Sequence, residues 1–305
     1  MRDAFINSLA DIAKDDPKTI LITGDLGFGV FDEFRNKFPG QFLNAGISEQ
    51  NMTSIACSMA LDGFKVYTYS IGNFPTLRCL EQIRNNICYH NANVTVVSIG
   101  AGFSYGQLGM SHFATEDVAI MRALPNITIA NPSSDKETYE ITKILHQEIN
   151  SPKFLRLDKS SASIFSKFDE DFFKPKLHSA GSDIALISSG GLLDEIVKAS
   201  KIIEEEGYSV SIISIPFLKP FNENSLIKIL NSHELISVFE EHNSGGLAGV
   251  ILEAMGKLSM FPKKFIHRSI PDEYPSIVGD QMYLREHYSL TSDKIAEFCL
   301  LSFRK

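Results

Sequence analysis

The sequence predicts two consecutive α/β domains, each built around a mostly parallel β-sheet. Short apolar runs rich in β-branched residues alternate with segments of helical periodicity through residues 1–157, and the same alternation resumes after residue 183. Between these stretches, residues 158–182 lose the periodicity and gather serine, lysine and aspartate. Strands that alternate with helices are typical of parallel sheets with helical crossovers. The length of 305 residues fits two domains, since a domain has roughly 100 to 200 residues.

The individual strands are predicted from short apolar runs. In the first domain these lie at 19–23, 65–70, 94–99, 127–130 and 154–157, and in the second at 184–188, 210–215, 234–240 and 264–270. The second set is separated by predicted helices at about 191–207, 222–232 and 245–258. The amphipathic segment 292–303 is expected to cover the second sheet. We place the domains at 1–170 and 183–305, with a linker at 171–182.

Composition and charge exclude several classes of function. The net charge of −8, without a cluster of lysine or arginine, argues against a nucleic-acid-binding protein. The chain has no run of about 18 apolar residues and no charged-then-apolar leader, so we expect neither membrane insertion nor export. No CxxC spacing occurs among the cysteines, which predicts reduced core thiols of a cytoplasmic protein and no metal site on this chain; they are Cys57, Cys79, Cys88 and Cys299.

Glu49 lies at the start of a predicted core helix. Ser48 is a suitable N-cap. The helix continues with apolar residues at the spacing of one buried stripe, namely Met52, Ile55, Ala56, Met59 and Ala60. An acidic residue in the first helical turn is usually exposed, where it interacts with the helix dipole. At this position the neighbouring motifs instead favour a buried, functional carboxylate.

Three further groups of polar or aromatic residues follow predicted strands. Gly-Asp-Leu-Gly at 24–27 follows the first strand, Asn73 and Phe74 follow the second, and GAGFSYGQLGMSH at 100–112 follows the third. Ligands of open α/β sheets bind beyond the carboxyl ends of the strands. We therefore expect these loops to meet at one edge of the first sheet.

These motifs resemble, in order and spacing, the pyrimidine-binding domain of thiamine-diphosphate enzymes, most closely that of transketolases. The resemblance rests on NAGISEQNM at 44–52, CLEQIRNNICYHNANV at 79–94 and GMSHFATEDVAIMRALPNITIANPSS at 109–134. In the second domain, EEHNSGGLAGVILEAM at 240–255 is similar to the Glu-His segment and Gly-Gly turn of the transketolase C-terminal domain. The resemblance extends over essentially the whole chain and implies a pyrimidine-binding domain followed by a transketolase C-terminal domain.

The resemblance also implies that half of the active site lies on another polypeptide. In the family, a Gly-Asp-Gly motif with a distal asparagine on a preceding domain holds the diphosphate and Mg²⁺. Asp25 and Asn51 imitate that spacing, but the second glycine of the motif is replaced by Leu26, so we regard the match as accidental. We expect a C-terminal subunit that is active only with an N-terminal subunit carrying the Mg²⁺ (or Ca²⁺) and diphosphate site, in an α2β2 heterotetramer.

By the resemblance, Glu49 hydrogen-bonds N1′ of the aminopyrimidine of thiamine diphosphate, and Phe74 stacks on that ring. Ile71 replaces a second family aromatic three residues earlier. Asp25 matches an aspartate near the cofactor, although a turn aspartate would look the same. His112 matches the histidine that faces the reacting carbons of the donor sugar. The implied reaction is the transfer of a two-carbon ketol unit from a ketose to an aldose or aldehyde.

The substrate loop departs from the family. Where transketolases carry Gly-Glu-Asp-Gly before the histidine, this chain reads Gly-Gln-Leu-Gly, so Leu108 replaces an aspartate that contacts a hydroxyl of the donor. Gly100 stands at the position of a phosphate-binding histidine, and Lys159 stands near that of a phosphate-binding arginine, with Arg156 three residues earlier. His242 is a further candidate for the substrate channel. These changes predict a non-standard sugar substrate.

Two alternatives stay open at this point. One is another enzyme of the same cofactor class, such as deoxyxylulose-phosphate synthase or the β subunit of a 2-oxoacid dehydrogenase. The other is a non-catalytic binding or regulatory module built on a pyrimidine-type domain.

Overall fold

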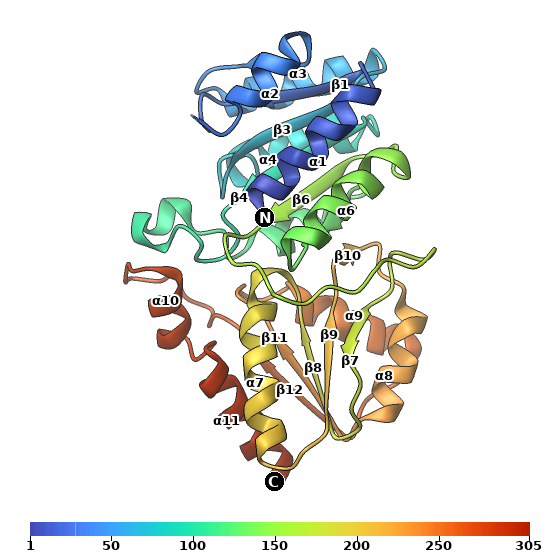
Figure 1. Cartoon of the computed structure of the whole chain (residues 1–305), viewed down its shortest axis with the longest axis vertical. Coiled ribbons are helices and arrows are strands. Elements are labelled where there is room, and N and C mark those ends of the chain that lie inside the picture. The colour runs from blue at the N-terminus through green and yellow to red at the C-terminus, as the bar shows by residue number, and fades with distance from the viewer. Residues whose placement is uncertain (28) are drawn as a thin grey trace.

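The computed structural model describes residues 1–27 and 29–305, which form two α/β domains in succession along the longest axis of the molecule (Figure 1). The first sheet has seven strands in the spatial order β10 (Phe217–Lys219), β5 (Thr128–Ala130), β6 (Lys153–Leu157), β4 (Val94–Ile99), β3 (Lys65–Ile71), β1 (Thr19–Thr23) and β2 (Phe42–Asn44). All neighbours in this sheet are parallel except β10 and β5.

Helices cover both faces of the first sheet. Aromatic and aliphatic side chains of α1 (Arg2–Asp15), α2 (Asp32–Lys37) and α6 (Asp135–Gln147) share one core with one face of the sheet. The opposite face carries α3 (Glu49–Leu61), α4 (Leu80–Gln82) and α5 (Asp117–Arg122), and α4 continues into a π-helical turn at Ile83–Cys88. The strands between them are apolar on both faces, as expected for parallel strands covered by helices.

The second sheet has five strands in the order β12 (Lys264–Arg268), β11 (Leu235–Phe239), β8 (Ile184–Ser188), β9 (Val210–Ser214) and β7 (Lys176–Ser179). Two helices, α7 (Leu193–Glu205) and α11 (Ser292–Arg304), pack together on one face. The other face is covered by α8 (Leu226–Ser232) and α9 (Leu247–Leu258). The short helix α10 (Gln281–His287) lies beside the loop that follows β4 (Figure 1).

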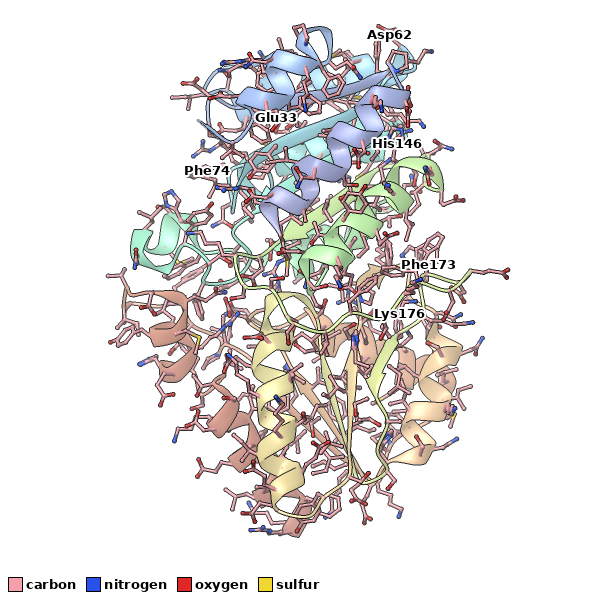
Figure 2. The ribbon with its side chains drawn as sticks, in the orientation of Figure 1. Glu33, Asp62, Phe74, His146, Phe173 and Lys176 are labelled. Carbon is pink, nitrogen blue, oxygen red and sulfur yellow. The ribbon has the colours of Figure 1, made fainter. Side chains whose placement is uncertain are left out.

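Each strand predicted from the sequence is present, with ends within two residues of the predicted ones. The predicted linker at 171–182 needs a correction, because its residues Lys176–Ser179 form β7, which pairs antiparallel with β9. Figure 2 shows Phe173 and Lys176 near the boundary between the domains, and the Phe173 ring lies 5.3 Å from that of Phe217 in β10. This segment is therefore partly built into both domains.

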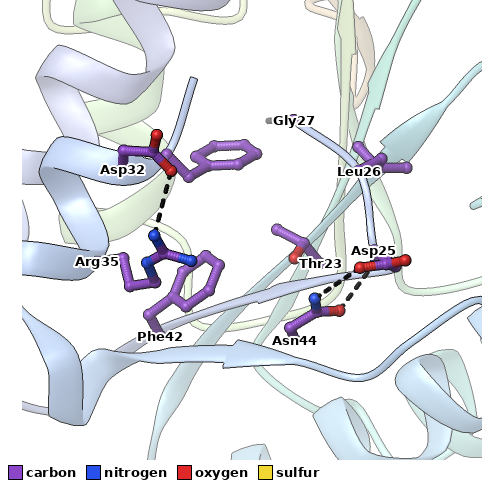
Figure 3. A pocket seen from close by; sticks show the side chains of 9 residues that line it. Thr23, Asp25, Leu26, Gly27, Asp32, Arg35, Phe42 and Asn44 are labelled. Carbon is purple, nitrogen blue, oxygen red and sulfur yellow. Dashed lines mark hydrogen bonds and ion pairs between the residues drawn. The ribbon is translucent and has the colours of Figure 1, made fainter. Parts of the chain in front are cut away.

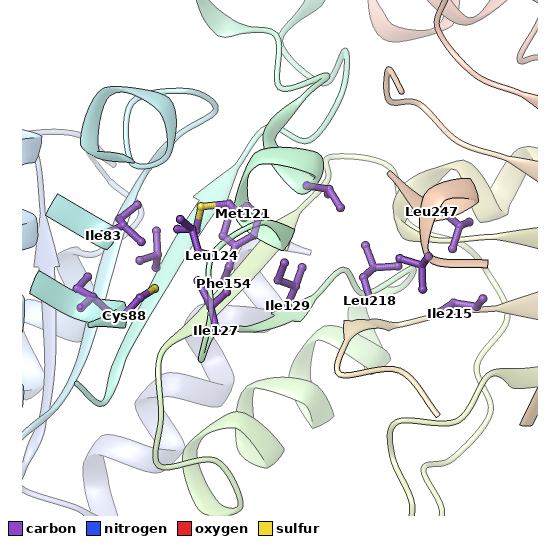
Figure 4. Close-up of a cluster of buried hydrophobic side chains, with 14 of the residues drawn as sticks. Ile83, Cys88, Met121, Leu124, Ile127, Ile129, Phe154, Ile215, Leu218 and Leu247 are labelled. Atoms are coloured by element: carbon purple, nitrogen blue, oxygen red, sulfur yellow. The ribbon is translucent and has the colours of Figure 1, made fainter. Parts of the chain in front are cut away.

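Apolar packing continues from one domain into the other. Strand β10 belongs to the second half of the chain but pairs with β5 at the edge of the first sheet, with Phe217 opposite Ala130. Figure 4 shows the adjoining cluster of buried side chains, which runs from Ile83, Cys88, Met121, Leu124, Ile127, Ile129 and Phe154 to Ile215, Leu218 and Leu247. This hydrophobic cluster thus continues from the first domain into the second.

A buried ionic cluster also crosses the domain boundary. Arg285 of α10 donates from Nε to Glu241 Oε2, and its Nη2 lies 3.9 Å from Asp158 Oδ2, at the end of β6. Gln281 Nε2 bridges the two acids, at 2.9 Å from Glu241 Oε1 and 3.1 Å from Asp158 Oδ1. Because Arg285, Glu241 and Asp158 are buried, each charge depends on the others for compensation.

The part of the chain that the structure describes contains no helix that is both long and apolar enough to cross a membrane. All four cysteines are buried, unpaired thiols, as the sequence predicts.

The first turn of α6 holds a buried carboxyl group. Ser134 Oγ accepts from the backbone N–H of Glu137 at 3.2 Å, and Glu137 Oε2 accepts from the backbone N–H of Ser133. Burial raises the pKa of Glu137 to about 7, against the opposing effect of the Ser133 hydrogen bonds. The folded protein therefore holds a proton on Glu137 in a pH range where the unfolded chain has lost it.

From this pKa we predict that Glu137→Gln stabilises the protein above pH 7. The folded-state pKa is raised, so the contribution of Glu137 to stability is fully present below pH 4.5 and is lost as the pH rises through about 7. Urea unfolding at pH 5 and pH 8 is expected to give similar free energies for wild type and variant at pH 5, and a difference on the order of 3 kcal/mol at pH 8. The exposed Glu140 of the same helix provides the control, Glu140→Gln, and an equal effect of both variants would contradict the prediction.

We also predict strong coupling between Arg285 and Glu241. Arg285→Met alone leaves two buried carboxylates without their cation and is expected to destabilise the chain by about 3 to 5 kcal/mol. Adding Glu241→Gln is expected to recover a large part of that loss in the same denaturation experiment, as a double-mutant cycle would report. The exposed pair Lys37 and Glu33 is the control, since Lys37→Met should change stability by less than about 1 kcal/mol. Additive effects of the two core substitutions would rule out the coupling.

Candidate active site

Three loops meet at the carboxyl edge of the first sheet. Strands β1, β3 and β4 are parallel neighbours, so the loops that begin at Gly24, Gly72 and Gly100 leave the sheet on the same side. The loops after β3 and β4 approach each other closely at Gly72, where φ is +50° and a Cβ atom would lie 3.0 Å from the carbonyl oxygen of His112. A residue with a side chain would be strained there, both by the positive φ and by the close carbonyl oxygen. The predicted gathering of these loops is confirmed.

Glu49 begins α3, as predicted, and it is buried with an exposed fraction of 4%. Its Cγ faces Gly24 of the loop after β1, so the carboxylate lies next to the edge of the sheet. Arg78, in the loop after β3, donates from Nη1 to Glu49 Oε2 at 2.9 Å. Ser48 occupies the N-cap position without a side-chain capping bond. The carboxylate is thus compensated by a cation from another loop.

Phe74 and His112 join Glu49 through Arg78. The guanidinium carbon of Arg78 lies 4.4 Å from the centre of the Phe74 ring, within the range of a cation–π contact. The rings of Phe74 and His112 are 5.2 Å apart in an edge-to-face arrangement, and both are half-buried. Ser111 Oγ lies 3.0 Å from His112 Nδ1. Three of the residues predicted for catalysis and cofactor binding therefore lie in one continuous set of contacts.

Asp25 is exposed and fixed by its neighbour in β2. It adopts a left-handed conformation with φ of +56°. Asn44 Oδ1 accepts from the backbone N–H groups of Asp25 and Gly46, both at 3.0 Å, and Asn44 Nδ2 donates to Asp25 Oδ1 at 2.9 Å. Figure 3 shows this pair at the rim of a cavity of about 280 Å³. Asn51 lies on the exposed side of α3, and the described residues contain no group of three or more His, Cys, Asp or Glu suited to a metal ion.

The predicted substrate residues fall into two groups. Leu108 lies in a 3-10 turn of the loop after β4 and is 56% exposed. Lys159 places its ammonium 3.8 Å from the centre of the Tyr105 ring, beside a cavity of about 330 Å³ that Arg2 also lines. Partial burial and the charge of Arg2 lower the pKa of Lys159, while Asp158 opposes the shift. At Gly100, the Tyr105 ring occupies the space that any side chain at this position would need.

Arg156 and His242, also predicted as substrate residues, are buried and engaged in contacts within the protein. Arg156 is buried and donates to Asp117 Oδ2 at 2.8 Å and to the carbonyl of Ala114 at 2.7 Å. His242 is buried at the domain boundary, where Nε2 accepts from the backbone N–H of Val118 and Nδ1 donates to the carbonyl of Asn243. Burial lowers the pKa of His242, which agrees with a neutral ring in these contacts. Arg156 thus supports the segment directly after His112, and His242 supports the start of α5.

Two residues of this region are not predicted from the sequence. Arg78 follows Phe74 by four positions in a segment with no charge pattern. Only the folded loop shows that the guanidinium of Arg78 lies over the Phe74 ring. Arg2 approaches Lys159 from the start of α1, and no motif signals a pairing over that sequence distance. Ile71, which the sequence does single out, lies half-buried at the end of β3, directly before the Gly72 turn.

The chain is similar in structure and in sequence to known proteins. The structure is similar to a solved one described as a split-gene transketolase, inactive beta4 tetramer, with a TM-score of 0.87, 26% identity and coverage of 99% of this chain and 97% of the other. Two sequence relatives are both described as a subunit of apulose-4-phosphate transketolase. The relative from Actinobacillus succinogenes is 29% identical and covers 88% of this chain and 86% of its own length. The relative from Phocaeicola vulgatus is 26% identical and covers 100% and 97%, respectively.

Two family models divide the chain between them. The model described as the transketolase pyrimidine binding domain matches residues 1–163, and the transketolase C-terminal domain matches residues 174–295. Their boundary falls in the segment where the apolar periodicity is lost. Since the first match alone spans more than half of the chain, the protein belongs to the transketolase family.

Proposed function

We propose that this chain is the C-terminal subunit of a two-chain transketolase that depends on thiamine diphosphate. The observation that carries the proposal is the buried carboxylate of Glu49 at the carboxyl edge of the first sheet. It lies in one set of contacts with the aromatic face of Phe74 and the imidazole of His112. A binding module without catalysis would not require a carboxylate at a buried position beside an aromatic ring and a histidine.

The residues at this edge fit the aminopyrimidine ring of the cofactor. That ring is planar, carries N–H donors, and needs a carboxylate at its rim and an apolar surface on its face. The planar guanidinium of Arg78 already makes both kinds of contact, with Glu49 at 2.9 Å and over Phe74 at 4.4 Å. Thiamine diphosphate, when bound, supplies the reactive carbon that accepts and releases the two-carbon unit.

Each side chain of the site has a distinct role in this proposal. Glu49 holds the proton that it shares with N1′, and its burial favours that shared position over water. Phe74 orients the ring by stacking. His112, half-buried and next to Ser111, moves a proton to or from the oxygen of the sugar at its Nε2. Asp25 and Ile71 shape the border of the site.

The proposal includes a partner that holds the diphosphate. The two family models that match this chain are those of the pyrimidine-binding and C-terminal domains, so we assign the Mg²⁺ (or Ca²⁺) and diphosphate site to an N-terminal subunit. The two relatives, each described as one subunit of a transketolase, and the split-gene structure support such a division. An α2β2 heterotetramer is the assembly that we propose.

The donor sugar is proposed to be non-standard. Leu108 offers an apolar surface where a carboxylate would contact a hydroxyl, so a donor with a different configuration or substitution at that carbon is favoured. The cavity that Lys159 and Arg2 line also contains Asp3, Asp135 and Asp158, and Arg2 is paired with Asp3, so its mixed charge assigns no anionic group to the donor. The two relatives described by the name apulose-4-phosphate transketolase support a donor outside the common ketose phosphates.

Our first prediction for the function concerns Glu49. Ketol transfer by the chain combined with its N-terminal partner is expected to fall by roughly 10²- to 10⁴-fold in Glu49→Gln, because the amide cannot share the proton with N1′. Heterotetramer formation, followed by light scattering, should stay intact. Glu81→Gln, at an exposed site of the same domain, serves as the control. Full activity of this chain alone, or an unaffected Glu49→Gln, would disprove the proposed function.

The second prediction concerns Leu108. In Leu108→Asp, kcat/KM for the common ketose phosphates is expected to rise relative to that for the natural donor, because the carboxylate restores a partner for the missing hydroxyl contact. A panel of ketose phosphates measured with wild type and variant tests this. Gln107→Asp adds the same charge at the neighbouring exposed position and should leave the ranking unchanged. If the ranking shifts equally in both variants, net charge explains the effect and the role of position 108 is refuted.

A further inference from the structure

Arg78 makes two contacts with the proposed cofactor site. Its Nη1 donates to Glu49 Oε2 at 2.9 Å, and its guanidinium carbon lies 4.4 Å from the centre of the Phe74 ring. The planar guanidinium of Arg78 therefore makes one charged hydrogen bond at its rim and one stacking contact on its face. The proposed function assigns the same two contacts to the aminopyrimidine ring. A planar guanidinium and a planar aminopyrimidine both present N–H donors in the plane of the group.

We propose that Arg78 occupies the aminopyrimidine position in the cofactor-free chain and is displaced by the ring when the cofactor binds. This inference rests on the proposed function and adds to it a side chain that controls access to Glu49. In the cofactor-free chain the guanidinium of Arg78 thus fills the place of the ring, and we call this its placeholder role. Cofactor binding includes the exchange of the guanidinium for the ring.

The two partners differ in their exposure to water. The side chain of Glu49 is 5% exposed, whereas that of Arg78 is 45% exposed. Glu49 therefore has no ready alternative to a protein or ligand donor, while the guanidinium of Arg78 can return to water at little cost. The asymmetry makes Arg78 the partner that leaves.

The backbone near Arg78 is fixed independently of its side chain. The carbonyl of Arg78 accepts from Gln50 Nε2 at 3.1 Å, and its N–H donates to the carbonyl of Asn73 at 3.1 Å. Rotation of the side chain alone is thus enough to release Phe74 and Glu49. The loop that holds Phe74 keeps its position during the exchange.

The placeholder also explains how the cofactor-free chain keeps a buried carboxylate. Loss of a buried carboxylate's cation leaves an uncompensated charge, which is strongly unfavourable. The guanidinium compensates Glu49 until the ring arrives. Because N1′ of the neutral ring is an acceptor, the exchange releases the guanidinium to water and takes up one proton, which Glu49 and N1′ then share. The cofactor ring must compete with Arg78, and its apparent affinity is lowered by that competition.

The test uses binding of 4-amino-5-hydroxymethyl-2-methylpyrimidine to the full-length chain, measured by calorimetry and NMR. Arg78→Met keeps a side chain of similar length and removes the competing guanidinium. We expect it to bind the pyrimidine roughly three- to tenfold more tightly than wild type, which is the strength of one half-exposed ion pair and one cation–π contact. Equal or weaker binding by Arg78→Met, including none, would overturn the inference.

A matched variant and a second readout separate displacement from a general effect of charge. Arg84 is exposed on the following helical turn and donates to Asn85, so Arg84→Met removes the same charge without touching Glu49 and should bind like wild type. The Nε–Hε resonance of Arg78 is expected to lose its ring-current shift when the pyrimidine saturates the wild-type chain. A resonance that keeps this shift at saturation would mean that Arg78 stays over Phe74, which is incompatible with displacement.

Glu49→Gln distinguishes this inference from the proposed function. If pyrimidine binding to both wild type and Arg78→Met is indifferent to Glu49→Gln, the proposed function itself fails. If binding depends on Glu49 but not on Arg78, the proposed function stands and only the placeholder role is excluded.

Discussion

The carboxylate of Glu241 connects the second domain to the loop that contains His112. Its Oε1 accepts from the backbone N–H of Phe103, its Oε2 accepts from Arg285, and its side chain fills the space beside Gly102, where φ is +54°. Asp158 holds the same loop through Ser104 Oγ at 2.7 Å. The loop after β4 is therefore fixed from the C-terminal domain as well as from its own sheet. The position of His112 depends on an acid nearly 130 residues away in the sequence.

Much of the fold can be predicted because long strands contain their own signal. The covered parallel strands are runs of apolar residues, and that pattern is enough to locate each of them. Strands β2, β7 and β10 are not predicted, because they are short and, unlike the equally short β5, do not lie in an apolar run of their own. Their pairing depends on the neighbours that they meet in the folded chain. For β10 the neighbour is β5, in the other domain. A local pattern cannot contain that information.

The site can be predicted from the sequence where a motif determines both the type of a residue and the loop on which it lies. Phe74 and His112 come together because their motifs follow the neighbouring parallel strands β3 and β4, and Glu49 joins them from the start of α3 through Arg78. Arg156 and His242 show what a motif leaves open, since a motif position does not reveal on which side of the strand or loop a side chain lies. Both are directed into the domain boundary, where Asp117 lies within 3.6 Å of His242 and pairs with Arg156. A charged residue near a ligand motif can equally be part of its support.

The cavity beside Lys159 shows why the substrate cannot be inferred from one altered position. Gly100 lacks the side chain that a phosphate-binding histidine would provide, and the Tyr105 ring occupies that space. The same ring lies 3.8 Å from the ammonium of Lys159, so it also sets where the cation is placed. Because a histidine at position 100 would collide with Tyr105, these differences from the family depend on one another. The empty position at Gly100 and the placement of Lys159 are therefore one coupled feature of the structure, whereas Leu108 lies on a separate, exposed turn of the same loop.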